Sequence, residues 1–143
     1  MSLSAFETGL AELLAAAGIG TWRPDTPYAS DETAILIRSI PNAPDRLIVI
    51  TAWLMSNDPG TGDALLCAQI RTRASTDPTT DQDVDDQVFN ALNGLHDTSI
   101  GGVPVTVMWH QSSLPLGPDA NQRWENSNNF YARVAWPSQL STD

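Results

Sequence analysis

The sequence contains no lysine. Its seven basic residues are all arginine, and seventeen acidic residues bring the formal net charge to -10 at pH 7. Proteins that bind nucleic acid present basic patches to the phosphates, so we expect a chain this acidic to be repelled by nucleic acid and by anionic membranes. Two explanations of the acidity stay open. It serves solubility, or it forms a surface past which nucleic acid slides without binding.

Cysteine and histidine are also scarce. Cys67 is the single cysteine, so no internal disulfide can form, and its apolar, strand-like surroundings predict that it packs inside. His96 and His110 are the two histidines, and without a second thiol they do not make a zinc site. An alternative pairs Cys67 with either histidine as nucleophile and base. A small hydrolase using two of the aspartates is a further alternative, although no nucleophile, base and orienting group converge in the sequence. We therefore expect no enzymatic activity, no metal and no cofactor.

Long apolar runs are absent too, since none approaches the roughly 20 residues that span a bilayer. Residues 1–18 lack a basic segment and carry Glu7 and Glu12, so we expect no signal peptide and a cytosolic site of synthesis. The chain has 143 residues, of which 41% are hydrophobic, and this is enough for one core. We expect a single domain over 1–143.

Two amphipathic segments predict helices. The first is expected over 5–17, with Ser4 as N-cap and Glu7 reaching back to close a capping box. The second opens within the acidic stretch 77–86, because the helix dipole favours aspartates in the first turns. The same aspartates resemble a calcium loop, but the stretch lacks the glycine and the final glutamate that such a loop requires.

The remaining pattern is rich in β-formers. Five strands are predicted, at 33–40, 46–54, 64–73, 103–110 and 129–136. The order α-β-β-β-α-β-β predicts an α+β fold in which two helices pack on a mostly antiparallel, five-stranded sheet. Trp53, Trp109 and Trp136 fall in the strands and are expected in the core. Trp124 falls in a loop beside an arginine, which favours an interface anchor over a core position.

Two arginines project from one face of the predicted strand 64–73, namely Arg71 and Arg73. One interpretation is ordinary surface charge or pairing with an acid inside the chain. The other is contact with a second subunit, because arginine is enriched at interfaces. A third arginine, Arg123, stands beside Trp124 in the stretch "LGPDANQRWENSNNFYARV", where a loop rich in Gly, Pro, Asp and Asn runs into the last strand.

Several stretches together resemble the tail terminator proteins of long-tailed phages, which are often labelled minor capsid proteins in actinobacterial phage genomes. In chain order they are "AAAGIGTW", "PDRLIVITAW", "LCAQIRTRA", "ALNGLHD" and "LGPDANQRWENSNNFYARV". The last is the most specific, in the form Leu-Gly-x-Asp-x-Asn-x-Arg followed by Asn-Phe in a strand. The positions that match this motif are Asp119, Asn121, Arg123, Asn128 and Phe130.

The resemblance implies a structural protein of the virion tail or neck. Such a protein forms a homo-oligomeric, hexameric ring that caps the tail tube and stops tube polymerisation. Its expected partners are the tail tube protein and the head-tail connector or stopper protein, and DNA passes through the bore without specific binding. A head-tail adaptor or tail completion protein is the alternative. We expect the subunit or tube contact to involve Arg71, Arg73, Asp119, Asn121, Arg123, Trp124, Glu125 and Asn128.

Overall fold

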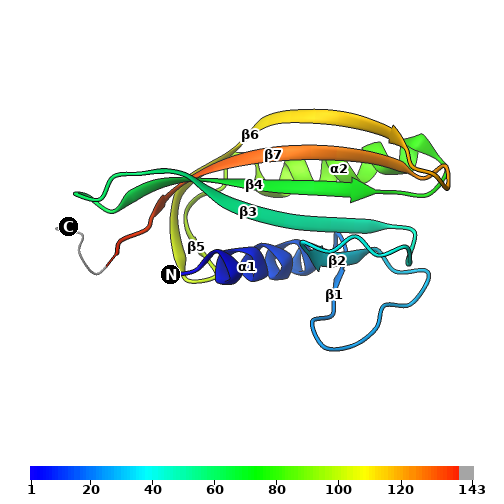
Figure 1. The fold of residues 1–143 in the computed structure, drawn as a ribbon, viewed down its shortest axis with the longest axis horizontal. Coiled ribbons are helices and arrows are strands. Elements are labelled where there is room, and N and C mark those ends of the chain that lie inside the picture. The colour runs from blue at the N-terminus through cyan, green and yellow to red at the C-terminus, as the bar shows by residue number, and fades with distance from the viewer. Residues whose placement is uncertain (139–143) are drawn as a thin grey trace.

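The computed structural model describes residues 1–138, whose ribbon is shown in Figure 1. The elements are α1 (Leu3–Ala16), β1 (Thr21–Trp22), β2 (Ala34–Ile37), β3 (Leu47–Asn57), β4 (Asp63–Arg73), α2 (Pro78–Leu92), β5 (His96–Ile100), β6 (Val103–Pro118) and β7 (Trp124–Ala135). All these strands belong to one sheet, in the order β1-β2-β3-β4-β7-β6-β5.

The sheet is seven-stranded and mixed. β2 runs parallel to β1 and to β3, and every other pair is antiparallel. The α+β class and the two helices are confirmed, whereas the prediction of five mostly antiparallel strands was wrong. β1 has only two residues and β5 reads HDTSI, so neither shows a strand pattern. β2 is parallel to β3 because residues 38–46 lead the chain back to the starting end of the sheet instead of closing a hairpin.

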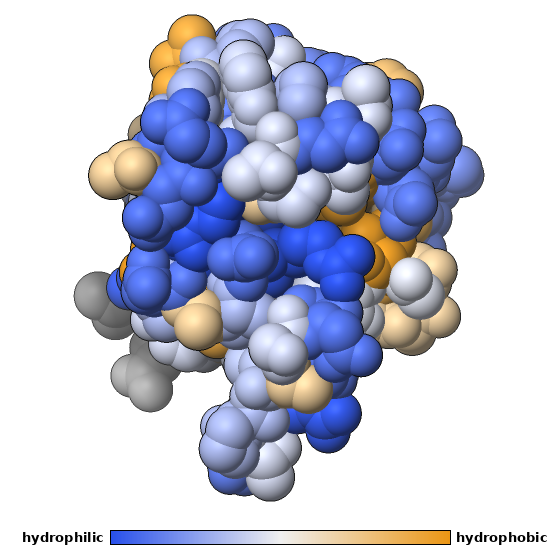
Figure 2. Space-filling model, turned by 90° about the vertical axis from the view of Figure 1, so that its right-hand side faces the viewer, coloured by the Kyte–Doolittle hydropathy of each residue, from blue (hydrophilic) through white to orange (hydrophobic). Residues whose placement is uncertain are grey.

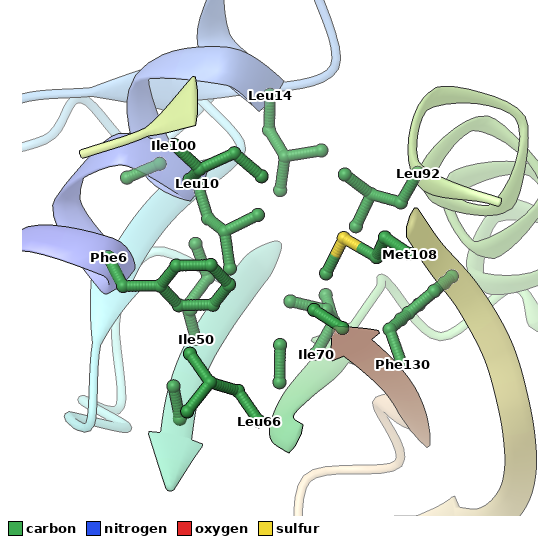
Figure 3. Close-up of a cluster of buried hydrophobic side chains, with 14 of the residues drawn as sticks. Phe6, Leu10, Leu14, Ile50, Leu66, Ile70, Leu92, Ile100, Met108 and Phe130 are labelled. Carbon is green, nitrogen blue, oxygen red and sulfur yellow. The ribbon is translucent and has the colours of Figure 1, made fainter. Parts of the chain in front are cut away.

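Both helices cover the same face of the sheet. α1 contacts β1, β2, β3 and β5, and α2 contacts β4, β6 and β7. Figure 3 shows Leu10 of α1 and Leu92 of α2 converging with Ile70 and Phe130 from the middle strands, all of them fully buried or nearly so. The opposite face carries no helix. No helix within residues 1–138 is long and apolar enough to cross a membrane.

The start of α1 differs from the prediction. Ser2, not Ser4, is the N-cap, and its hydroxyl accepts the Ala5 N–H at 3.0 Å. Glu7 does not close a capping box. It is only 1% exposed, and its Oε2 accepts the Ala52 N–H at 2.8 Å and pairs with Arg38 Nε at 2.9 Å. Glu7 therefore ties α1 to the outer edge of β3.

The tryptophans only partly follow the sequence-based expectation. Trp53 was predicted in the core but is 38% exposed. It lies opposite Cys67 in the β3–β4 ladder, and both side chains project to the helix-free face. Trp109 also lies on that face, half-buried, with its ring 5.9 Å from that of Tyr131. Trp136 is half-buried at the margin of the core. Cys67 is buried, as predicted.

Candidate functional site

The residues expected at the subunit contact gather at the end of the sheet where β6 turns into β7 and β4 ends (Figure 1). The ladder sets Arg73 of β4 opposite Glu125 of β7. The β6–β7 turn supplies Arg123, and the loop at residues 41–45 packs against it. Figure 2 views the molecule from this end, where hydrophilic residues cover most of the surface and apolar residues form separate patches.

Arg123 is the centre of this cluster. Its guanidinium donates from Nε to Asp119 at 2.9 Å, and from its terminal nitrogens to Asp45 at 3.2 Å and to the Asn42 side chain at 3.1 Å. Asp119 also accepts the backbone N–H groups of Asn121 and Arg123, each at 2.9 Å, which fixes the turn. Desolvation alone would raise the pKa of Asp119, but the hydrogen bonds from Arg123 outweigh it and lower that pKa.

Arg73 holds the same loop from the other side. Its guanidinium donates to four backbone carbonyls at 2.8 to 3.2 Å, those of Pro41, Asn42, Pro44 and Asp45. Burial is the main cause that lowers the pKa of Arg73, and the neighbouring Arg123 charge acts in the same direction. The guanidinium hydrogen bonds therefore serve to fold residues 41–45 onto the sheet.

Arg71 and Glu125 form an ion pair across β4 and β7, with Arg71 NH2 lying 3.1 and 3.2 Å from the two carboxylate oxygens. Arg71 is about a third exposed on its side chain, at 36%, and the carboxylate is more buried, at 10%. Arg71 Nε is buried and has no hydrogen-bond partner among the described residues. Within the subunit this pair neutralises the helix-free face at this end.

A second polar cluster lies under α2 and was missed by the sequence analysis. Asp85 of α2 is nearly buried, and its carboxylate accepts from the Thr72 hydroxyl and the Asn128 amide, each at 2.8 Å, and from the Asn126 amide. Burial raises the pKa of Asp85, and these three hydrogen bonds oppose the rise. Asp77 is the N-cap of α2. Asp85, which was part of the calcium-loop alternative, and the N-cap Asp77 therefore both have structural roles within the subunit.

The side chains of the loop-strand motif thus bond mainly within their own chain. Arg71 pairs with Glu125 inside the chain, as the internal-pair interpretation expected. Arg73 is 5% exposed and donates to backbone carbonyls, not to an acid, among the described residues. Arg123 is 6% exposed and pairs with Asp119 and Asp45. Asn121 is exposed, and its amide donates to Asn42 at 3.3 Å. Trp124 is half-buried, with backbone hydrogen bonds to residues 74 and 75. Contact of Asn121 or Trp124 with another subunit stays a prediction.

The residues considered for chemistry lie apart. Burial raises the pKa of the Cys67 thiol to about 11, which disfavours the nucleophilic thiolate. His110 packs edge-on against Phe89 and Phe130, with ring centroids 5.4 and 5.2 Å away. His96 is exposed and contacts the Gly94 carbonyl. Among residues 1–138, no group of three or more His, Cys, Asp or Glu side chains could hold a metal ion.

The other four arginines are also engaged within the subunit. Arg23 pairs with Glu32 at 2.7 Å and Arg38 pairs with Glu7 at 2.9 Å. Two further guanidinium groups have neutral partners: that of Arg46 donates to the carbonyl of Asp31, and that of Arg133 lies 5.7 Å from the centroid of the Trp109 ring. These four arginines are thus distributed over separate contacts, and within the described chain they do not form a phosphate-binding patch.

Two strand segments offer a free outer edge. β2 pairs with β3 only as far as Ile50, and Glu7 takes the Ala52 N–H, so residues 53–57 have no strand beside them on that side within the described chain. β5 pairs with β6 only as far as Val107. Asn93 and Leu95 bond β6 up to residue 110, which leaves the outer edge of 111–118 without a neighbouring strand in the described structure.

Exposed apolar side chains gather on these two segments. Trp53, Leu54 and Met55 lie on the first, which we name the β3 edge (residues 53–57). Leu114 and Leu116 lie on the second, the β6 edge (residues 111–118). A register shift between Leu54 and Ser56 disturbs the strand alternation at the β3 edge, and bulges of this kind re-aim side chains. The two edges are the candidate contact surfaces of the molecule.

Comparison with known proteins agrees with this architecture. No protein with a curated description matches the sequence. A chain in the solved structure titled "Virion of native gene transfer agent (GTA) particle" is similar to this chain, with a TM-score of 0.62 and 17% identity over 92% of both chains. That likeness shows a shared fold.

The family model described as "Bacteriophage tail terminator protein" matches residues 13–136, from the last turn of α1 past the end of β7. The match therefore includes every strand and the whole of α2. It confirms the resemblance carried by the loop-strand motif, and the chain belongs to the bacteriophage tail terminator family.

Proposed function

We propose that this protein is a structural component of the virion that caps the tail tube as a hexameric ring. The ring ends tube polymerisation and joins the tail to the head connector. The observation that carries the proposal is the tail terminator family match over residues 13–136. The similar chain in a gene transfer agent virion supports a place in a virion particle.

The charge of the molecule is compatible with a channel for DNA. The chain has a net charge of -10 and no lysine, and its arginines have partners within the subunit. Phosphate contacts from Lys and Arg supply most of non-specific DNA affinity, so DNA would pass such a surface without being retained. We propose that DNA is a passing occupant of the bore.

The alternative is a head-tail adaptor or tail completion protein, which also belongs to the neck but does not set tail length. A hydrolase finds less support. Asp85 is held by three neutral hydrogen-bond donors, and Cys67 is buried on the opposite face of the sheet. Neither carries an adjacent base in the arrangement described above.

Tail length is the measurement that separates terminator from adaptor. A phage lacking this gene should produce detached tails with tubes of variable and excessive length, and a plasmid copy should restore uniform tails. Electron microscopy of the complemented tails should show a ring at the end that joins the head. Tails of normal length that merely fail to join heads would instead establish the adaptor alternative.

A further inference from the structure

The two free edges lie at opposite ends of the molecule. β4 and β7 separate β3 from β6, and each neighbouring pair in this part of the sheet is antiparallel. β3 and β6 therefore run in opposite directions. The β3 edge and the β6 edge are both carboxyl-terminal halves of their strands, so they point to opposite ends of the long axis (Figure 1).

Neither edge is protected by charge. Soluble proteins guard free strand edges with lysine or other charges, proline, bulges or a covering element. Pro115 and Pro118 lie on the β6 edge and register shifts occur at both edges, so backbone pairing there is restricted. This chain has no lysine, and the segments WLMSN at 53–57 and QSSLPLGP at 111–118 contain no charged residue. Within residues 1–138, five of the eight exposed large hydrophobic side chains lie on these two segments. The composition is typical of edges that are covered in an assembly.

We propose that the β3 edge of one copy packs against the β6 edge of the next, so that subunits overlap end to end around the ring. This inference rests on the proposed ring. The contact joins two different surfaces of identical chains, which is a heterologous interface and forms a closed ring when the rotation closes. The antiparallel directions of β3 and β6 suit an antiparallel contact between copies in the same orientation.

The distribution of charge is compatible with a second copy as the occupant. Two chains of net charge -10 repel each other over most of their surfaces. The uncharged β3 and β6 edges are places where two such chains can approach without burying a charge. A single chain supplies both edges, so each subunit in the ring covers the β6 edge of one neighbour and the β3 edge of the other.

Side-chain packing contributes together with the backbone. Pro115 and Pro118 lack the N–H group, so a ladder along the β6 edge is incomplete. Leu114 and Leu116, which are 61% and 40% exposed, provide apolar contact instead. A hollow of about 350 Å³ opens beside Leu54 and is bordered by Trp136 and other residues. In the proposed contact it faces the leucines of the neighbouring subunit.

Cross-linking in assembled tails tests the contact. A phage lacking the gene is complemented with Met55→Cys, Leu114→Cys or the double variant, and purified tails are treated with a short bismaleimide. The native Cys67 is only 1% exposed, so background labelling is low. The double variant should give a ladder of covalent oligomers on denaturing gels. Each single variant should give none, and co-expression of the two single variants should give linked pairs.

Charge substitution provides a second measurement should the cysteine variants assemble poorly. Met55→Glu and Leu114→Glu should each reduce complementation at least tenfold while leaving the thermal unfolding midpoint within about 2 °C of wild type, because both positions are exposed in the subunit. Ile40→Glu is the matched control. Ile40 is 47% exposed and lies in the loop between β2 and β3, outside both edge segments, so its complementation should stay at the wild-type level.

The outcomes separate this inference from the proposed function. Linked dimers from a single cysteine variant would show a two-fold contact and overturn the end-to-end arrangement. Cross-links only to another tail protein would assign the edges to that partner and also overturn it. A third outcome is that the tails are capped and uniform in length, no ladder forms, and both Glu variants complement fully. This would overturn the edge contact but leave the terminator function intact. Normal tail length in the gene-deleted phage would overturn the function itself.

Discussion

Arg123 shows how one side chain can hold segments that are far apart in the sequence. It bonds Asp119 in its own turn, and Asn42 and Asp45, which lie 81 and 78 residues earlier. The Asp-x-Asn-x-Arg pattern that carries the family resemblance is therefore built into the folding of the subunit. Its partners explain why aspartate and arginine stand four residues apart, since the same carboxylate also fixes the turn between them.

Substituting Arg123 by Ala should lower the free energy of unfolding by about 3 kcal/mol, because it leaves Asp119 partly buried without its cation. Arg23→Ala is the control. Arg23 forms an exposed pair with Glu32, and the loss of such an exposed pair should cost much less stability than the loss of Arg123. Urea unfolding followed by tryptophan fluorescence measures both. If Arg123→Ala is as stable as Arg23→Ala but fails to assemble, the result would contradict the structural role and indicate that Arg123 acts at the subunit contact.

Gly101 marks the tightest approach between α1 and the sheet. A Cβ on Gly101 would lie 1.8 Å from the Ala5 carbonyl oxygen, and its φ is +58°. Gly101→Ala should therefore destabilise the subunit by about 3 kcal/mol or more, since overpacking adds to left-handed strain. The adjacent Gly102 has φ +78° and open space around it, so Gly102→Ala should cost only about 1–2 kcal/mol. Thermal unfolding compares the two variants. Equal losses of stability would contradict the prediction and mean that α1 moves away from the new methyl group without cost.

At the scale of elements, Asp85 couples α2 to two strands. Its carboxylate receives hydrogen bonds from Thr72 on β4 and from Asn126 and Asn128 on β7. The side chain thus connects α2 to the middle of the sheet by directional hydrogen bonds. An apolar contact at this place would not fix how far the helix lies along the strands. We infer that Asp85 fixes the position of α2 along the sheet.

The raised pKa of Asp85 gives this contact a pH dependence. The folded state binds the proton more tightly than the unfolded state, so the contribution of Asp85 to stability falls as pH rises from the ordinary aspartate pKa through the raised one. Asn does not titrate. The stability advantage of wild type over Asp85→Asn should therefore shrink as the pH rises above the ordinary aspartate pKa of about 4.

Urea unfolding of both proteins across this pH range measures the difference. Asp83→Asn, at an exposed position on the same helix, removes the same formal charge and serves as control. An advantage of wild type that grows with pH would mean that the ionised carboxylate is favoured in the folded state, and it would contradict the expected direction.

Local sequence pattern predicted the elements that carry a strong period. Both helices and the strands β3 and β4 were located, because each shows apolar spacing of 3.6 or 2 residues or a long apolar run. β6 and β7 were located only in part: they were predicted at 103–110 and 129–136, whereas the structure has them at Val103–Pro118 and Trp124–Ala135. Trp124 therefore begins a strand and does not lie in the predicted loop. β1 and β5 were missed because their strand character comes from pairing with a neighbour and not from their own residues. The parallel direction of β2 depends on the path of a loop, which composition does not encode.

The candidate site was predicted in location but not in role. Asp119 and Arg123 stand close in the sequence, so their pairing was accessible, whereas the partners of Arg73 lie about thirty residues away. The bond between Asn126 and Asp85 spans 41 residues and left no local signal. Trp53 was assigned to the core because strand periodicity does not tell which face the helices cover. The exposed edges became visible only with the sheet order.

At the scale of the whole molecule, net charge opposes assembly. Six neighbouring subunits of a hexameric ring would each carry -10, and like charges separated by more than a Debye length of about 10 Å at 0.1 M salt are largely screened. Assembly must therefore overcome repulsion that salt weakens. The proposed contact between the β3 and β6 edges contains no ion pair, so salt should not weaken the contact itself.

The response to salt therefore distinguishes two models of the interface. If the edges form it, raising the salt concentration from about 0.05 to 0.5 M should strengthen self-association, because the screening length falls and apolar contact is retained. If arginine–carboxylate pairs such as those of Arg71 and Glu125 cross the interface, the same change should weaken it.

Sedimentation velocity of the purified protein measures the trend. Where assembly needs the tube as template, the fraction of tubes that carry a ring is measured instead. Sodium chloride is the suitable salt, because sulfate also strengthens apolar burial by exclusion. Weakening of the rings with rising sodium chloride would contradict the edge contact and favour the arginines, and Arg71→Ala would then be expected to abolish the salt dependence.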